Sequence, residues 1–424
     1  MTLSTGGTRQ RLRLLALLLI GMGLWPGAAP AQTPGVAGRS AAQITGETFE
    51  AAKYRPAILR LGFSPAKGKT VDSTTDSFID LTLIPPEGEM VGFRREVSSR
   101  QFNQLLRKLY QQLASQQPLQ VADPTSPARQ LDALFVQPIE QSLRRMQIST
   151  LLISAEPGLQ AVPFSALHDG QAYFGERFPF SLTPSLALTN LAPPVRRAGG
   201  QMLAAGASLF QGLSPLPLVP QELDQIVKGK QVSTYLNKDF TPQLLLDKAG
   251  DPQVKRVHVA THAEFVPGGP AAARLYTGVA PMSLRKLAEM RQRRGDAQLD
   301  LFALSACRTA LGDADSELGF AGLALQAGSR SAIGSLWYVD DVATSALFVQ
   351  FYRYLDKGIP KAEALQFTQR AMASGMIRLL KDQVINGKGE VLLSGLTTAE
   401  QRRIAGGLRH PFYWAGIQLL GTPW

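Results

Sequence analysis

The sequence predicts an α/β/α sandwich with a mostly parallel central sheet, preceded by a small antiparallel β meander and two helices. The first observation behind this prediction is that short apolar runs alternate with helical segments from residue 150 onward. Such alternation is typical of parallel sheets with helices on both faces. The second observation is that three strand-like runs lie close together before residue 96, separated by turn signals. Strands spaced so closely pair as an antiparallel meander.

The front part of the chain is expected to hold strands at 57–63, 78–84 and 89–95. The clearest turn signal between them is Pro85-Pro86-Glu87-Gly88, because proline and glycine favour turns and interrupt strands. Segments 99–116 and 127–146 then carry apolar residues three and four positions apart, which predicts two amphipathic helices.

The central sheet is expected to contain six apolar runs, at 150–155, 202–207, 256–261, 299–304, 331–337 and 413–420. These runs are short, nearly uncharged and bounded by turn residues, as is typical of strands buried on both faces. Helices are expected between them at 221–227, 242–248, 283–293, 318–326, 342–355 and 361–380.

Residues 1–31 have the features of a secretory signal peptide. Three arginines, at positions 9, 11 and 13, precede an apolar core at 14–25 that is too short to span a bilayer, and Ala29-Pro30-Ala31 provides a cleavage site. We therefore expect export to a periplasm or the extracellular space, with no membrane span after cleavage. A flexible lead at 32–48, the meander with its helices at 49–125 and a main domain at 126–424 are expected to follow.

The chain is basic, but its charge is scattered. Residues 1–31 hold three of the 44 Lys and Arg residues and no acidic residue, so 41 basic and 33 acidic side chains remain after cleavage, a formal charge of +8. The basic pairs are separated by long neutral stretches without interleaved aromatic residues. This pattern is typical of a solvated surface and argues against nucleic acid as a partner.

The single cysteine, Cys307, follows the predicted strand at 299–304 after the small-residue turn Ser305-Ala306, and His262 ends another strand-like run in the same way. The carboxyl ends of parallel strands meet at one edge of a sheet, where catalytic groups collect. Two adjacent parallel strands would therefore hold this histidine beside the thiol. One cysteine excludes an intrachain disulfide and a thiolate metal cage. A buried, inert cysteine is the alternative, and the thiol alone does not decide between the two.

Several motifs, in this order and spacing, resemble the CHAT family of caspase-like (clan CD) cysteine peptidases. They are PGL at 157–159 with VPFSAL at 162–167, VATH at 259–262, LSACRTALG at 304–312, and AG at 327–328 leading through SAI at 331–333 to SLWYVDD at 335–341. The closing PFYWA at 411–415 is also typical. The resemblance extends from residue 151 to the C-terminus, and it implies that the main domain has the caspase-like form of the α/β/α sandwich.

The resemblance implies a catalytic dyad of His262 and Cys307, with the backbone N–H groups of Ala263 and Cys307 holding the oxyanion. Caspases have glycine where this chain has Ala263. No third catalytic residue is assigned, and neither a cofactor nor a metal is expected. Trp337, Asp340 and Asp341 are candidate substrate-binding residues, and the acidic side chains favour a preference for Arg or Lys before the cut. Acidic residues are also ordinary at the start of a helix.

Two functions are compatible with these residues. The first is an exported cysteine endopeptidase that acts on a protein or peptide substrate and is kept latent until an activating protein partner or a cleavage orders its loops. The second is a catalytically silent scaffold that keeps the fold for protein–protein interaction. The presence of both dyad residues favours the first.

Overall fold

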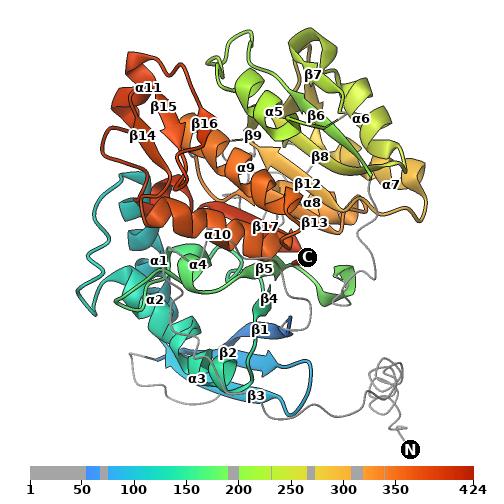
Figure 1. Cartoon of the computed structure of the whole chain (residues 1–424). Coiled ribbons are helices and arrows are strands. Elements are labelled where there is room, and N and C mark those ends of the chain that lie inside the picture. The colour runs from blue at the N-terminus through green and yellow to red at the C-terminus, as the bar shows by residue number, and fades with distance from the viewer. Residues whose placement is uncertain are drawn as a thin grey trace, which may run out of the picture. The chain divides into compact units, whose positions relative to one another are not determined.

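The computed structural model of this chain describes residues 54–66, 75–189, 200–230, 232–264, 273–306, 319–338 and 340–424. An eleven-stranded sheet, in the order β3-β2-β1-β4-β5-β17-β13-β12-β8-β6-β7, runs through the described part of the chain (Figure 1). Seven of its ten strand pairs are parallel and three are antiparallel. The predicted mostly parallel α/β architecture is therefore confirmed.

The strands of this sheet have the following bounds: β1 Pro56–Pro65, β2 Ser77–Ile84, β3 Val91–Val97, β4 Thr150–Ala155, β5 Phe180–Thr183, β6 Gln201–Gly206, β7 Thr234–Leu236, β8 Val254–Ala260, β12 Leu301–Ser305, β13 Ser331–Ser335 and β17 Ile417–Gly421. Two small antiparallel sheets accompany it. One contains β9 Ala263–Glu264, β10 Arg274–Tyr276 and β11 Pro281–Ser283, and the other β14 Arg378–Leu380, β15 Gln383–Ile385 and β16 Val391–Leu393.

The α-helices have these bounds: α1 Ser99–Ala114, α2 Pro127–Phe135, α3 Gln137–Arg145, α4 Phe174–Arg177, α5 Val219–Val227, α6 Pro242–Gly250, α7 Ala288–Arg294, α8 Gly319–Gln326, α9 Asp341–Asp356, α10 Lys361–Ala373 and α11 Thr398–Arg403. Short 3-10 turns include η4 Phe164–Ala166, η5 Leu186–Leu188, η6 Asn237–Asp239, η8 Leu284–Leu287 and η10 Pro411–Tyr413. Among the described residues, no helix is both long enough and apolar enough to cross a bilayer.

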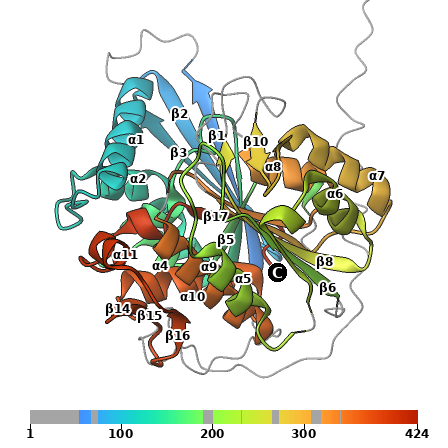
Figure 2. The same cartoon turned by 90° about the horizontal axis from the view of Figure 1, so that it is seen from above.

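The helices form two layers on the sheet. Figure 2 shows α6, α7 and α8 on one face, and α5, α9 and α10 on the other. Strands β12 and β13 are buried at every position, and β8 at all but two, because both faces of the sheet are covered there. The near-continuous apolar runs of the sequence reflect this two-sided burial.

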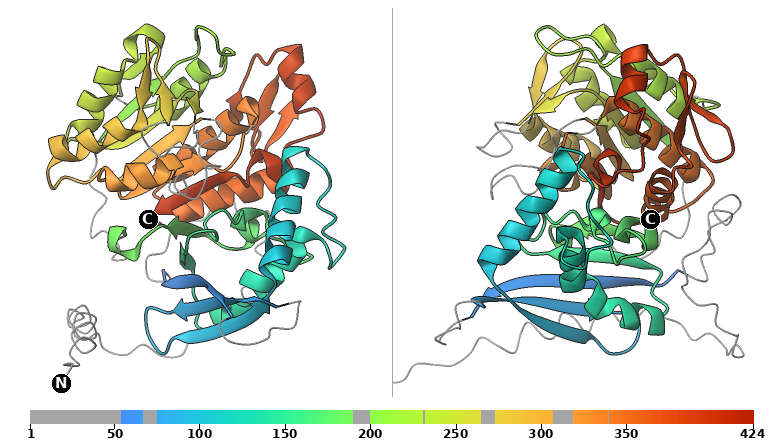
Figure 3. Two further views of the ribbon diagram at one scale, coloured as in Figure 1. Left: turned by 180° about the vertical axis from the view of Figure 1, so that it is seen from behind. Right: turned by 90° about the vertical axis from the view of Figure 1, so that its left-hand side faces the viewer.

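The meander joins the main sheet instead of forming a sheet of its own. Strand β1 pairs in parallel with β4 over Pro56 to Leu61, and antiparallel with β2 on its other side. In Figure 3 the blue strands of the meander lie at the opposite end of the sheet from β6. Along β2, buried and half-buried residues alternate, as expected for a strand with one face on the core.

Two helices end earlier than the sequence predicts. The segment expected as one helix at 127–146 is two helices, α2 and α3, with Pro138 near the start of the second. Proline cannot donate a backbone hydrogen bond, and its ring collides with the preceding helical turn. Helix α10 ends at Ala373 because Gly375 adopts φ +77°, and residues 378–380 form β14 instead.

Candidate active site at the carboxyl edge of the sheet

Strands β8 and β12 are parallel neighbours with aligned carboxyl ends. Their register pairs Ala260 with Ser305, and the N–H of Thr261 donates to the Ser305 carbonyl over 3.1 Å. His262 follows on one strand. On the other, Ala306 is the last residue described before the gap at 307–318, so Cys307 itself lies outside the described residues. The two strands predicted to carry the dyad thus end side by side.

The chain that leads into Cys307 is fixed from a second neighbour, β13. Ser335, the last residue of β13, donates its hydroxyl to the Ala306 carbonyl over 3.0 Å. Ala306 is only 5% exposed and belongs to the core beneath α6, α7 and α8. Sequence reasoning missed this role, since a serine at the end of a strand is common.

His262 is held by the loop between β6 and α5, residues 207–218. Its Nε2 lies 2.8 Å from the carbonyl oxygen of Ser214, and its ring lies against Phe210 with the ring centroids 4.6 Å apart. A carbonyl only accepts hydrogen bonds, so Nε2 carries the proton. In the neutral imidazole, Nδ1 is therefore the atom that can accept a proton. Sequence reasoning missed Ser214 because a backbone carbonyl has no residue signature.

Asn237 fixes the start of that loop. Its side-chain oxygen accepts from the N–H groups of Ser208 and Leu209, over 2.8 and 3.3 Å. The loop is closed farther along by the N–H of Leu216, which donates to the Ser208 carbonyl over 2.9 Å. Asn237 itself has φ +52°, a conformation that asparagine tolerates better than most residues. Hydrogen bonds thus hold the loop that places the Ser214 carbonyl next to His262.

The backbone of Ala263 belongs to β9, which pairs with β10. The N–H of Tyr276 donates to the His262 carbonyl over 3.0 Å, and Ala263 is paired with Leu275 one position farther on. Hydrogen-bonded and non-hydrogen-bonded pairs alternate in an antiparallel ladder. The Ala263 N–H therefore points away from β10 and is not used in this ladder.

Trp337 lies two residues beyond the end of β13 and is 4% exposed. Its indole N–H donates to the Phe412 carbonyl over 2.9 Å, and its ring meets Tyr110 edge to face at 5.9 Å between centroids. A Cβ on Gly416 would come within 2.7 Å of the same ring, so the tryptophan fills its site closely. Its predicted contact with substrate stays a prediction.

Asp340 and Asp341 lie at the start of α9, and both bind an arginine from α11. Asp340 is the N-cap and accepts from the N–H of Ala343 over 3.1 Å. Arg403 donates Nε–H to Asp340 over 2.9 Å and also hydrogen-bonds Asp341. Burial, and secondly the neighbouring Asp340 charge, raise the pKa of Asp341 above its usual value. The pair therefore combines a capping role with a partly neutralised acidic surface, and its contact with substrate also stays a prediction.

His258, four residues before His262, has a different environment. It is fully buried, and its Nε2 lies 2.9 Å from Oε1 of Glu222 on α5. The other oxygen of Glu222 accepts from the Ser345 hydroxyl on α9 over 2.6 Å. Within the described ranges, no group of three or more His, Cys, Asp or Glu side chains is arranged to hold a metal ion. His258 thus joins the sheet to two helices.

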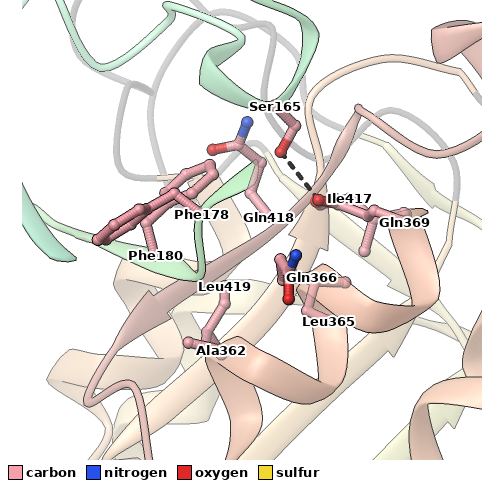
Figure 4. Close-up of a pocket in the computed structure, with 10 residues that line it drawn as sticks. All are labelled: Ser165, Phe178, Phe180, Ala362, Leu365, Gln366, Gln369, Ile417, Gln418 and Leu419. Atoms are coloured by element: carbon pink, nitrogen blue, oxygen red, sulfur yellow. Dashed lines mark hydrogen bonds between the residues drawn. The ribbon is translucent and has the colours of Figure 1, made fainter. Parts of the chain in front are cut away.

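A small cavity lies between α10 and strands β5 and β17 (Figure 4). It is lined by Ser165, Phe178, Phe180, Ala362, Leu365, Gln366, Gln369, Ile417, Gln418 and Leu419. The Ser165 hydroxyl donates to the Gln369 side chain over 3.2 Å, as the dashed line shows. None of the predicted site residues lines this cavity. Ser165, from the VPFSAL motif, is therefore a packing residue.

The CHAT domain model matches residues 125–422. No curated protein sequence matches significantly. Among solved structures, the chain is similar to separase in the Saccharomyces cerevisiae separase–securin complex, with 10% identity and a TM-score of 0.47 over 88% of this chain, which spans 30% of the separase chain. It is also similar to the Arg-specific cysteine proteinase gingipain R, with 10% identity and a TM-score of 0.39 over 72% of this chain and 69% of that chain.

The family match covers more than half of the chain and includes both strands that precede the predicted dyad residues. The resemblance drawn from the motifs is thereby confirmed, and the chain belongs to the CHAT domain family.

Proposed function

We propose that this protein is an exported cysteine endopeptidase in which Cys307 attacks the peptide carbonyl and His262 is its acid–base partner. The observation that carries the proposal is the register of β8 and β12, whose carboxyl ends are hydrogen-bonded to each other through Thr261 and Ser305. His262 follows one of these ends by two residues, and Cys307 follows the other by two.

The orientation of His262 supports a role in proton transfer. A free thiol is only slightly ionised at neutral pH, so a nucleophilic cysteine needs a base or an imidazolium beside it. With Nε2–H directed at the Ser214 carbonyl, Nδ1 remains to take the thiol proton. The Ser214 carbonyl also stabilises the imidazolium that forms. A backbone oxygen thus orients the imidazole in the proposed dyad, for which no third side chain is assigned.

The reaction then proceeds in two steps. The Cys307 sulfur adds to the peptide carbonyl, and the N–H groups of Ala263 and Cys307 stabilise the oxyanion that develops. His262 gives its proton to the leaving amine as the peptide C–N bond breaks, which leaves a thioester on Cys307. Water, deprotonated by His262, hydrolyses the thioester and restores the thiol. The outward direction of the Ala263 N–H agrees with this role.

Export rests on the leader features of residues 1–31 and places the enzyme in a periplasm or outside the cell. An activating protein partner, or a cleavage, would order the loops that complete the site.

Alkylation of the single thiol tests the dyad. In the folded protein, Cys307 should react with iodoacetamide at pH 6 to 7 faster than a free thiol, because imidazolium favours the thiolate. His262→Ala should move the pH midpoint of this reaction up to that of an ordinary thiol. Cleavage of fluorogenic Arg, Lys and Asp peptides should depend on Cys307 and be absent from Cys307→Ala.

A thiol that reacts only after denaturation, together with no peptide cleavage or self-cleavage that depends on Cys307, would contradict the peptidase. The chain would then be a silent scaffold for protein interaction. Because the protein has one cysteine, no other thiol contributes to the alkylation rate.

The acidic pair Asp340–Asp341 gives the proposed preference for Arg or Lys before the cut, and Arg403 competes for the same carboxylates. Arg403→Gln should therefore raise kcat/KM for Arg and Lys peptides by up to about fivefold, the equivalent of the 1 kcal/mol contributed by a partly exposed ion pair. Arg402→Gln, on the exposed surface of the same helix, is the matched control. Equal changes for Arg and Asp peptides would mean that the pair only caps α9.

A further inference from the structure

Exposed apolar side chains concentrate near His262. Among the described residues, seven large hydrophobic side chains are exposed: Met90, Leu209, Leu213, Val279, Tyr338, Leu380 and Val391. Leu209 and Leu213, at 67% and 38% exposure, lie on the loop that contacts this histidine, and Val279, at 56%, lies on the turn after β10, whose Tyr276 hydrogen-bonds to it. Single exposed apolar residues are ordinary, but several grouped at one site indicate binding.

Leu209 and Leu213 alternate with the residues that hold His262. Phe210 stacks against the imidazole and Ser214 accepts from its Nε2, while the leucine before each of them stays exposed. The loop therefore has one side against His262 and an aliphatic side towards solvent. The hydrogen bonds from Leu209 to Asn237 and from Leu216 to Ser208 hold this arrangement in place.

Val279 lies on the turn between β10 and β11, and strand β10 contacts His262 through its backbone. The N–H of Tyr276, just before this turn, donates to the His262 carbonyl over 3.0 Å. The turn also packs closely against Asn237, the residue that holds the loop at 207–218. A Cβ on Gly278 would come within 1.8 Å of the Asn237 carbonyl. The N–H of Gly278 donates to the Phe240 carbonyl over 3.0 Å. Asn237 thus contacts both loops.

We propose that Leu209, Leu213 and Val279 form an apolar rim that selects substrates with a large aliphatic or aromatic side chain on the leaving-amine side of the cleaved bond. The side of the bond follows from the chemistry. His262 must reach the leaving nitrogen, so the residues that follow this nitrogen in the substrate pass beside His262 and over the rim. This inference deepens the proposed function and rests on it.

Paired peptides test the rim. Two substrates would share every residue before the cut and carry either Leu-Phe or Ser-Gly directly after it. The native enzyme should prefer the apolar peptide by about tenfold in kcat/KM, since a hydrophobic site distinguishes side chains by at least that factor. The Leu209→Ser, Leu213→Ser, Val279→Ser triple variant should lose this preference through KM and keep kcat on the Ser-Gly peptide.

Met90→Ser is the matched control, because Met90 is 66% exposed on the turn between β2 and β3. It removes an equally exposed apolar side chain from the meander and should leave the preference intact. All three rim side chains are exposed, so the triple variant should fold, with Leu213→Ser alone as a milder version. Circular dichroism and thermal unfolding check the fold of each variant.

Binding to Cys307→Ala separates the rim from the peptidase. This variant should bind the fluorescein-labelled Leu-Phe peptide about tenfold more tightly than the Ser-Gly peptide, and the added rim substitutions should abolish the difference. Binding of this kind without cleavage by the native protein would support the rim and overturn the proposed function. Cleavage with equal kcat/KM for both peptides, or a preference that survives the triple variant, would overturn the rim and leave the peptidase standing.

Discussion

Glu222→Ala should lower the free energy of unfolding by about 2–5 kcal/mol, because it removes the shared acceptor from a buried hydrogen-bond network. Glu222 is 1% exposed and its two oxygens face His258 on β8 and Ser345 on α9. Alanine leaves the imidazole N–H and the serine hydroxyl without an acceptor in a site too apolar for easy solvation. Each such group costs about 1–3 kcal/mol when buried and unpaired. Urea unfolding followed by circular dichroism measures the change.

Two further variants make this prediction specific. Asp224→Ala removes an exposed carboxylate from the same helix and should change the free energy of unfolding by less than about 0.5 kcal/mol. Glu222→Gln keeps the shape and one acceptor oxygen, and should recover part of the loss. A Glu222→Ala protein as stable as the Asp224→Ala protein would show that the network contributes little to folding.

The network also bears on the candidate active site. Helix α5 carries Glu222, and the loop that precedes α5 carries Phe210 and Ser214, which hold His262. His258 and His262 lie on or just after the same strand, so the Glu222–His258 bond fixes this loop and this strand to each other. Glu222→Gln, which should fold, is expected to slow the alkylation of Cys307 at neutral pH, because a weaker bond to His258 holds this loop less firmly against His262.

The strands that carry the proposed chemistry could be predicted from the sequence because two-sided burial leaves a strong apolar signal. The expected strand at 150–155 agrees with β4 at both ends, and 256–261 and 331–337 differ from β8 and β13 by one or two residues. Such runs report local composition, and the parallel fold led us to expect that these two strands end at the same edge of the sheet. Their register is known from the structure alone. The dyad itself stays a prediction, since Cys307 lies outside the described residues.

The parts that could not be predicted depend on how distant segments meet. The Ser214 carbonyl and the Asn237 amide reach the site from a loop and a turn without any periodic pattern. Strand β5 was missed because its four residues form too short a run, and one of its two neighbours in the sheet, β17, comes from a distant part of the chain. The burial of Arg294 could not be predicted either, because this residue belongs to a cluster of arginines that is typical of solvated surface.

Arg294→Ala should lower the free energy of unfolding by about 4 kcal/mol, because a buried arginine with fully used donors is removed. Arg294 is 3% exposed, and its guanidinium donates to five backbone carbonyls, those of Ala249, Asp251, Val254, Ala297 and Gln298, over 2.7–3.2 Å. These carbonyls belong to the end of α6, the start of β8 and the turn after α7, so one side chain joins three segments. Water that enters the space left by the side chain would hydrogen-bond to some of these carbonyls, which limits the loss of unfolding free energy.

Lysine cannot replace this arginine, since an ammonium has three donors on a flexible stem and the guanidinium has five in a fixed plane. Arg294→Lys should therefore recover less than half of the loss, whereas an interaction based on charge alone would be restored in full. Arg291→Ala, on the exposed side of the same helix, should stay within about 0.5 kcal/mol of the native protein. Thermal and urea unfolding of the three variants distinguish these outcomes, and a fully restored Arg294→Lys protein would contradict the role of the five carbonyls.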